Sequence, residues 1–200
     1  MTVRHARKEE KRLRILQAAR DLFGEHGFDQ TTTRAIARAA GVANGTLFLY
    51  ARDKVDLLLM LYIDALRELT RTGLPDDDAR PLHQAVLDVY TGFFTFYERD
   101  PALGRVFVRE VLFAQGERGT DYAALNEEFA TRLSLCVGRA QDRGELRPDV
   151  APVEVVAMSF AHYVMVIYFW IQQSEPQAAD ARAMLDRTLR LMWEGLGPRG

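Results

Sequence analysis

Apolar residues recur three and four positions apart along nearly the whole chain, and this helical spacing is the strongest constraint on the fold. Runs that alternate apolar and polar residues and are rich in β-branched side chains, which would indicate strands, are missing. The first predicted helix illustrates the pattern with one apolar stripe made of Ile15, Ala18, Ala19, Leu22 and Phe23. The spacing therefore predicts an all-α fold of about nine helices.

The predicted helices are separated by glycine, proline and short polar segments. Gly27 is expected to end the first helix, because glycine accepts the left-handed conformation common at helix ends. Gly41 marks the turn between the second and third helices, and longer connections are expected at residues 73–81, 115–121 and 144–150. The helices themselves are expected at residues 8–26, 31–40, 44–50, 54–72, 82–99, 101–114, 122–143, 152–173 and 178–194.

Residues 31–50 have the properties of a helix-turn-helix. This motif needs an apolar underside, a glycine near the turn, and a second helix whose exposed face enters the major groove. A hydroxyl from the three threonines at 31–33 is expected to accept a hydrogen bond from a free N–H of the first turn. The apolar underside is expected from Ile36, Ala37, Ala40, Val42 and Leu47. The side chains expected to face DNA belong to Asn44, Gly45, Thr46, Phe48 and Tyr50.

The charge of the chain is distributed unevenly. Residues 1–54 hold 11 Lys or Arg and six Asp or Glu, whereas the rest of the chain holds 15 and 22. A basic end on an acidic body suits a protein that contacts a polyanion through one end. Charge alone leaves open the alternative of chance clustering on a solvated first helix.

Several other classes of protein are disfavoured. The chain contains no HExxH, P-loop, Gly-rich nucleotide turn or G-x-S-x-G motif, and its four histidines lie on separate elements. Cys136 is the single cysteine and shares an apolar stripe with Phe129 and Leu133, which indicates a packed thiol. We therefore expect no enzymatic activity, no cofactor and no metal site. The charged N-terminus does not resemble a secretory signal, and a cytoplasmic location is expected.

The segment 155–171 is apolar enough to be mistaken for a membrane span. It is about 17 residues long, at the short limit for crossing a bilayer, and it contains Ser159 and His162. A helix buried in the core or at a subunit interface accounts for it better. No membrane association is expected.

Residues 15–58 resemble the N-terminal domain of TetR-type (tetracycline-repressor family) transcriptional regulators. The resemblance rests on four stretches in the family's order and spacing: GFDQTT at 27–32, IARAAGV at 36–42, GTLFLY at 45–50 and DKVDLL at 53–58. It implies a helix-turn-helix DNA-binding domain at 1–54, joined through the helix at 54–72 to a ligand-sensing and dimerisation domain at 55–200. The chain departs from the family pattern at Ala43, where a capping serine is common, and at Leu49 and Ala51.

The resemblance also implies a set of DNA contacts. Hydroxyl and ammonium groups would bind phosphates from Thr32 or Thr33, Tyr50 and Lys54. Arg34 would contact a guanine edge, and Asn44 and Thr46 would contact bases or a thymine methyl. Gly45 would allow close approach, and Phe48 would pack on sugar or methyl groups. Alternatives remain open at this point: Thr32 as a helix cap, Arg34 as a solvated charge, and Phe48 and Tyr50 as core aromatics.

One recognition helix reads too few base pairs for useful specificity, so a homodimer on a palindromic duplex operator is expected. By resemblance, the helices at 152–173 and 178–194 form the dimer interface; the alternative is that they only close the monomer core.

A ligand pocket is implied among the fifth to eighth helices, and its aromatic residues favour a lipophilic effector. The candidate lining residues are Phe93, Phe96, Tyr97, Phe107, Arg109, Phe113, His162, Tyr163 and Phe169, although rings of this kind also occur as ordinary core. The resemblance thus implies a repressor that a lipophilic small molecule releases from its operator. The alternative is a DNA-binding regulator without a small ligand, controlled by a protein partner.

Overall fold

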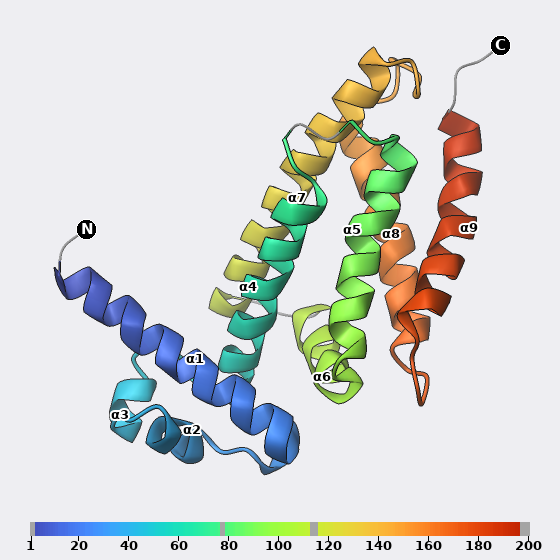
Figure 1. The fold of residues 1–200 in the computed structure, drawn as a ribbon. Coiled ribbons are helices and arrows are strands. Elements are labelled where there is room, and N and C mark those ends of the chain that lie inside the picture. Colours follow the sequence, from blue (N-terminus) through green and yellow to red (C-terminus); the bar gives the residue numbers. More distant parts are fainter. Residues whose placement is uncertain (1–2, 77–78, 113–115, 197–200) are drawn as a thin grey trace. The chain divides into compact units, whose positions relative to one another are not determined.

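The computed structural model describes residues 3–76, 79–112 and 116–196. Within them it contains nine helices and no strand, which confirms the predicted all-α class (Figure 1). The helices are α1 (Val3–Gln30), α2 (Thr33–Ala39), α3 (Asn44–Leu47), α4 (Lys54–Gly73), α5 (Leu82–Glu98), α6 (Pro101–Leu112), α7 (Glu117–Asp142), α8 (Pro152–Trp170) and α9 (Ala178–Leu196).

Two of the first helices differ from the prediction for local reasons. Gly27 lies inside the assigned range of α1, but its φ of 76° and ψ of 166° interrupt the helical geometry at the residue predicted to end it. α3 covers only 44–47 instead of 44–50, because the next residues form tight turns. In these turns the N–H of Leu49 donates to the carbonyl of Thr46 at 3.1 Å, and the N–H of Tyr50 donates to that of Leu47 at 2.9 Å.

The prediction of a loop at 115–121 is wrong for the described residues of this segment, because α7 begins at Glu117. Gly116 directly precedes α7 and has a φ of 61°, which favours glycine. Gly119 lies in the first turn of α7, where its N–H donates to the carbonyl of Gly116 at 3.1 Å. A second glycine nearby therefore did not extend the loop.

The chain forms two compact units. The first consists of Met1–Ala65 and Ala102–Asp121, and the second of Leu66–Pro101 and Tyr122–Gly200. This division differs from the expected boundary at residue 54, since the first part of α4 and nearly all of α6 belong with α1–α3. α4 and α7 each continue from one unit into the other.

In the first unit, α2 packs against α1 and α3 packs against α2 (Figure 1). Four of the five residues of the predicted apolar stripe of α1 are buried, among them Ile15 and Phe23, and Leu22 is half-buried. Ile36 of α2 and Leu47 after the turn are buried too. Burial of this apolar surface is what holds two helices as short as α2 and α3, which would not persist alone in water.

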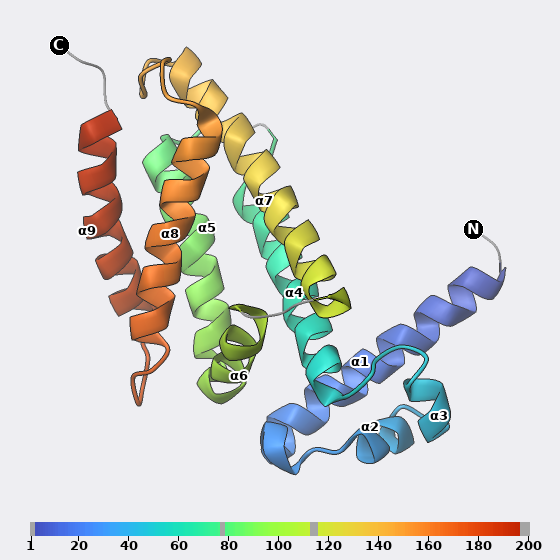
Figure 2. The same cartoon turned by 180° about the vertical axis from the view of Figure 1, so that it is seen from behind.

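In the second unit, α5, α8 and α9 pack side by side (Figure 2). Polar contacts join α5 to α9: His83 Nε2 lies 2.6 Å from Asp186 Oδ1, and Arg182 donates to Asp88 at 3.1 Å. The indole N–H of Trp170 donates to the carbonyl of Gln177 at 2.8 Å, which fixes the turn between α8 and α9. These contacts hold the helices that surround the cavity described below.

Ala43 occupies the N-cap of α3 and makes no side-chain hydrogen bond, as its methyl group requires. Its φ of −64° and ψ of 145° suit a capping residue. We predict that Ala43→Ser raises the free energy of unfolding by about 1 kcal/mol, because the hydroxyl accepts a bond from a free N–H of the first turn. Urea denaturation measures the change.

Ala39→Ser is the matched control, because Ala39 is exposed and lies within α2. Serine there is expected to leave stability unchanged or slightly lower it, since serine is a weaker helix former. Equal stability of the two variants would contradict the capping argument.

Candidate nucleic-acid interface

The start of α2 is fixed by two adjacent threonine hydroxyls. Thr32, in an extended conformation, accepts a hydrogen bond from the N–H of Ala35 at 3.2 Å, as predicted for a cap. Thr31 is buried, and its hydroxyl lies within hydrogen-bond distance of the carbonyls of Leu22 at 3.0 Å and Gly27 at 2.8 Å. Thr31 therefore attaches the entry of α2 to the end of α1.

The turn between α2 and α3 has the geometry that a helix-turn-helix needs. Gly41 adopts a φ of 65°, and the N–H of Val42 donates to the carbonyl of Ala37 at 3.0 Å. Of the five predicted underside residues, Val42 is half-buried and the other four are buried: Ile36, Ala37, Ala40 and Leu47. The opposite face of the motif is consequently not part of this apolar core.

The predicted DNA-facing residues lie on this opposite face. Thr32, Arg34, Asn44, Gly45 and Phe48 are exposed, whereas Thr33, Thr46 and Tyr50 are half-buried. Phe48 is 47% exposed and Leu49 is 78% exposed, so Phe48 is not the core aromatic that one alternative held it to be. Large apolar side chains held in water in this way mark a contact surface when they cluster.

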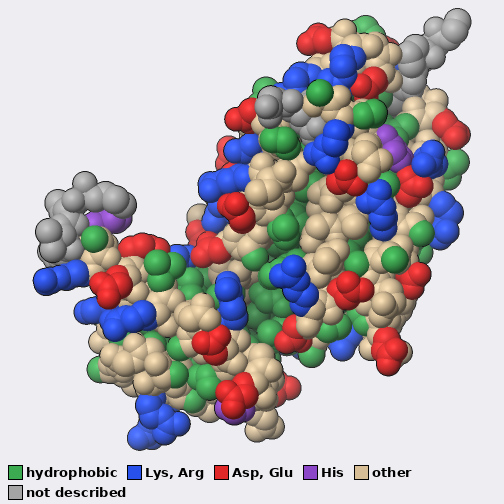
Figure 3. Space-filling model, in the orientation of Figure 1, with side chains coloured by type: hydrophobic (Ala, Val, Ile, Leu, Met, Phe, Trp, Pro, Cys, Tyr) green, Lys and Arg blue, Asp and Glu red, His purple; other side chains and the backbone are tan. Residues whose placement is uncertain are grey.

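Lys and Arg side chains lie on the surface formed by α1 to α3, interspersed with acidic ones (Figure 3). On α2, both Arg34 and Arg38 are exposed. On α1, Arg12 is instead paired with Asp64 at 2.7 Å and with Glu9 at 3.1 Å. The charge nearest the turn is thus available to a polyanion, whereas that of Arg12 serves the packing of α1.

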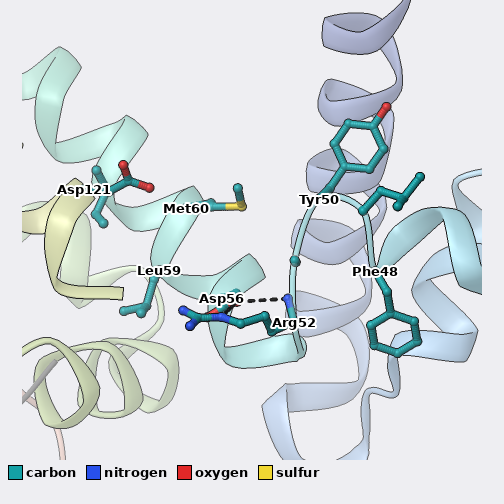
Figure 4. Close-up of a pocket in the computed structure, with 10 residues that line it drawn as sticks. Phe48, Tyr50, Arg52, Asp56, Leu59, Met60 and Asp121 are labelled. Carbon is teal, nitrogen blue, oxygen red and sulfur yellow. Dashed lines mark hydrogen bonds and ion pairs between the residues drawn. The ribbon is translucent and has the colours of Figure 1, made fainter. Parts of the chain in front are cut away.

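A hollow of about 250 Å³ lies between the segment after α3 and the first half of α4. Figure 4 shows Tyr50 and Phe48 on one side of it, and Leu59, Met60 and Asp121 on the other. Arg52 reaches across to Asp56, with Nε 2.8 Å from Oδ2, and its own N–H donates to the same oxygen at 2.9 Å. This pair fixes the chain between the recognition segment and α4.

The beginning of α4 is capped by an aspartate. Asp53 Oδ1 accepts from the N–H groups of Val55 at 2.9 Å and Asp56 at 3.0 Å. Lys54, expected to bind phosphate, has its ammonium on the end of α1 instead, where it donates to the carbonyls of Phe28 at 2.7 Å and Asp29 at 3.1 Å.

The second unit contains a small cavity of about 30 Å³, and none of its lining residues is charged. Seven rings dominate the lining, which consists of Leu66, Thr70, Tyr90, Phe93, Tyr97, Tyr122, Leu125, Asn126, Phe129, Phe160 and Tyr163. The phenol oxygens of Tyr97 and Tyr163 are 3.2 Å apart, and that of Tyr90 lies 3.4 Å from Ser159 Oγ. Burial raises the pKa of Tyr90 and Tyr163, so these phenols remain neutral.

Three of the nine candidate pocket residues, Phe93, Tyr97 and Tyr163, line this cavity. The other described candidates do not line this cavity. Phe107 stacks on Tyr62 in the first unit at 4.8 Å between ring centroids. Arg109 is largely exposed and paired with Glu110.

Phe96, His162 and Phe169 do not line this cavity either, and Phe113 lies outside the described residues. Phe96 is half-buried beside Tyr97. His162 contacts the carbonyl of Met158 through Nδ1 at 2.7 Å, and Phe169 is 57% exposed.

The helical spacing of the sequence contained a signal for the lining residues that were not predicted. Tyr90 precedes Phe93 and Tyr97 by three and seven positions, and therefore shares their helix face. Tyr122, Leu125, Asn126 and Phe129 repeat the same spacing on α7. Following these faces of α5 and α7 along the sequence would have identified most of the residues that line the cavity.

α8 has apolar side chains on its buried and exposed sides alike. It is long and apolar enough to cross a membrane by length and composition, and 39% of its most apolar window is buried. The exposed large apolar residues of α8 and α9 are Val153, Met158, Met165, Tyr168, Phe169 and Leu191.

Comparison with known proteins agrees with this geometry. Residues 15–61 match the sequence profile described as "Bacterial regulatory proteins, tetR family". The HTH-type transcriptional repressor KstR2 of Rhodococcus jostii is 32% identical over 151 residues, which are 72% of this chain and 71% of that protein. The Fatty acid metabolism regulator protein of Bacillus subtilis is 40% identical over 55 residues, 28% of each chain.

A solved structure extends the similarity over nearly the whole chain. Thermus thermophilus FadR, a TetR-family transcriptional repressor in complex with lauroyl-CoA, is 27% identical with a TM-score of 0.73, over 94% of this chain and 96% of that one. These relatives are regulators and repressors, not enzymes. With its exposed helix-turn-helix, this chain belongs to the TetR family and is a DNA-binding transcriptional regulator.

Proposed function

We propose that two copies of this chain hold an operator duplex through their α2–α3 segments and that a lipophilic effector bound in the second unit releases the DNA. The observation that carries the proposal is the two-sided helix-turn-helix, with Ile36, Ala37 and Leu47 buried beneath and Arg34, Asn44 and Phe48 exposed above. A protein that acts on DNA in a bacterial cell in this way works in the cytoplasm.

The exposed face divides into phosphate and base contacts. Thr32, Thr33 and Tyr50 have hydroxyls suited to phosphate oxygens, which set the register of the protein on the duplex. Thr32 serves this role and the cap together, since its oxygen has a second lone pair beside the one that accepts from Ala35.

Base reading falls to side chains around the turn. The guanidinium of Arg34 matches the O6 and N7 acceptors of guanine. Asn44 and Thr46 read bases or a thymine methyl, and Gly45 brings the backbone close. Phe48 packs on sugar or methyl groups, which accounts for its exposure in the free protein.

Dimerisation is proposed through α8 and α9. Met158, Met165 and Phe169 are exposed and separated by seven and four positions, so they share one face of α8. Leu191 is 71% exposed on α9. A second copy that covers these side chains removes apolar surface from water and forms a four-helix interface with the required symmetry. This accounts for the apolar character of α8 without a membrane.

The effector is proposed to be lipophilic, with an uncharged buried portion. The support is the aromatic lining without a charged residue, in which an unpaired carboxylate would be costly to bury. Thermus thermophilus FadR binds lauroyl-CoA. A cavity of about 30 Å³ has room for a water molecule but not for an acyl chain, so the rings must separate when an effector enters.

Release then follows from differential affinity. An effector that binds only the expanded cavity draws the population toward that conformation. DNA is lost to the extent that the expanded conformation binds the operator less well. The alternative of control by a protein partner makes no use of this uncharged cavity and is not favoured.

The first prediction concerns base reading. Arg34→Ala is expected to cost about 1–3 kcal/mol of binding free energy, and only on operators that have guanine at one position. Fluorescence anisotropy on operators with single base-pair changes measures this. Arg38→Ala is the control on the same helix, because Arg38 is also exposed. Equal loss on every operator would show that Arg34 contacts phosphate instead.

The second prediction concerns the effector, with lauroyl-CoA as the probe. Leu125→Phe adds a ring where Leu125 lines the cavity, and is expected to retain operator binding but resist release by lauroyl-CoA. Leu135→Phe makes the same change at an exposed position of α7 and is expected to behave as the unmodified protein.

Anisotropy of labelled operator measures release, and a thermal shift measures binding of the probe. Release of operator DNA from both variants at the same lauroyl-CoA concentration would place the effector outside the cavity. Absence of both release and thermal shift for the unmodified protein would exclude acyl-CoA as its effector class.

A further inference from the structure

The ammonium of the half-buried Lys54 is bound to the end of α1. Nζ donates to two successive carbonyls, those of Phe28 at 2.7 Å and Asp29 at 3.1 Å, and lies 4.4 Å from the centroid of the Phe28 ring. Carbonyls at the end of a helix carry partial negative charge, and the face of an aromatic ring attracts a cation. The ammonium therefore has two carbonyl acceptors and one aromatic ring as partners without DNA.

The backbone of Lys54 is held independently of these contacts. Asp53 caps the first turn of α4, and the Asp56 carboxylate accepts from the N–H and the guanidinium of Arg52. With the backbone fixed, the long side chain acts as a bridge from α4 to residues 28–29. A bridge of this kind transmits displacement from one end to the other.

Residues 28–29 lead directly into the DNA-reading helices. The Phe28 carbonyl also accepts from the N–H of Thr31 at 3.3 Å, so it is shared by Lys54 and by the segment that enters α2. The Thr31 hydroxyl lies on the carbonyls of Leu22 and Gly27, and Thr32 caps α2. A shift of the first turn of α4 therefore acts on the start of α2 through three consecutive contacts.

We propose that Lys54 is a positioning residue that ties the end of α1 to the start of α4, and not a phosphate contact. α4 continues into the second unit, where Leu66 and Thr70 line the cavity. The tie is thus the point at which movement of α4 reaches the start of α2. This inference goes beyond the proposed function. Its test by DNA affinity depends on operator binding, whereas its test by melting temperature does not.

Lys54→Met tests the tie, because methionine retains the apolar stem and removes the charge and all three donors. Two quantities are measured on the full chain: the melting temperature, and the slope of log affinity against log salt for operator DNA. Loss of the tie is expected to lower the melting temperature by about 4 °C and to weaken binding to all operators alike, with the salt slope unchanged. A lost phosphate contact would instead reduce the slope by about 0.9 for each phosphate.

Lys11→Met is the matched control, because Lys11 is an exposed lysine of α1. It is expected to leave the melting temperature unchanged. Phe28→Leu is the second variant if Lys54→Met does not fold, since it keeps both carbonyls and removes only the ring beneath the ammonium. It is expected to lower the melting temperature by a smaller amount and to leave the salt slope unchanged.

A salt slope reduced by about 0.9 per phosphate in Lys54→Met would overturn the proposal, whatever the melting temperature. An unchanged melting temperature in both Lys54→Met and Phe28→Leu would also overturn it. A lower melting temperature with weak DNA binding by the unmodified protein would support the tie while rejecting the proposed function, which keeps the two failures distinct.

Discussion

Burial of one side of the α2–α3 segment is the constraint on which the rest of the structure depends. Four and seven residues are too few for independent helices, so α3 and α2 exist because Ile36, Ala37 and Leu47 are removed from water. On the opposite side, Arg34, Asn44 and Phe48 are exposed. Exposure of Phe48 is therefore a direct consequence of how the motif folds, and the proposed DNA contact would use it.

The connection between sensing and DNA binding depends on α4 being one helix. Its first turn is fixed by Asp53 and by the Arg52–Asp56 pair, and its last turns contribute Leu66 and Thr70 to the cavity. An effector that separates the rings around Tyr90 and Tyr163 must displace the helices that carry them. In the proposed mechanism, a displacement that reaches Leu66 and Thr70 is carried to the first turn of α4 because the helix is continuous between them.

Features that depend on neighbouring residues could be predicted from the sequence. The helical class, the Gly41 turn, the Thr32 cap and the Asp53 cap all follow from local spacing and side-chain chemistry, and the structure contains each of them. The apolar underside also follows, because the side that Ile36 shares with Ala40 is set by the helical repeat.

Features that depend on distant partners could not be predicted in this way. The Lys54 ammonium lies on carbonyls 25 and 26 positions earlier in the chain, a partnership that no local pattern encodes. Phe107 belongs to the first unit because it stacks on Tyr62, although its ring made it a pocket candidate. The two glycines at 115–121 were also misleading, since Gly116 has a positive φ whereas Gly119 lies within α7.

Selection of bound duplexes from a random library, followed by footprinting at two salt concentrations, tests the central claim most directly. The account predicts a twofold-symmetric site whose half-sites are about 34–36 Å apart, or a multiple of this distance, with affinity that falls steeply as salt rises. Enrichment of no sequence, or binding to a single half-site with no dependence on salt, would contradict it.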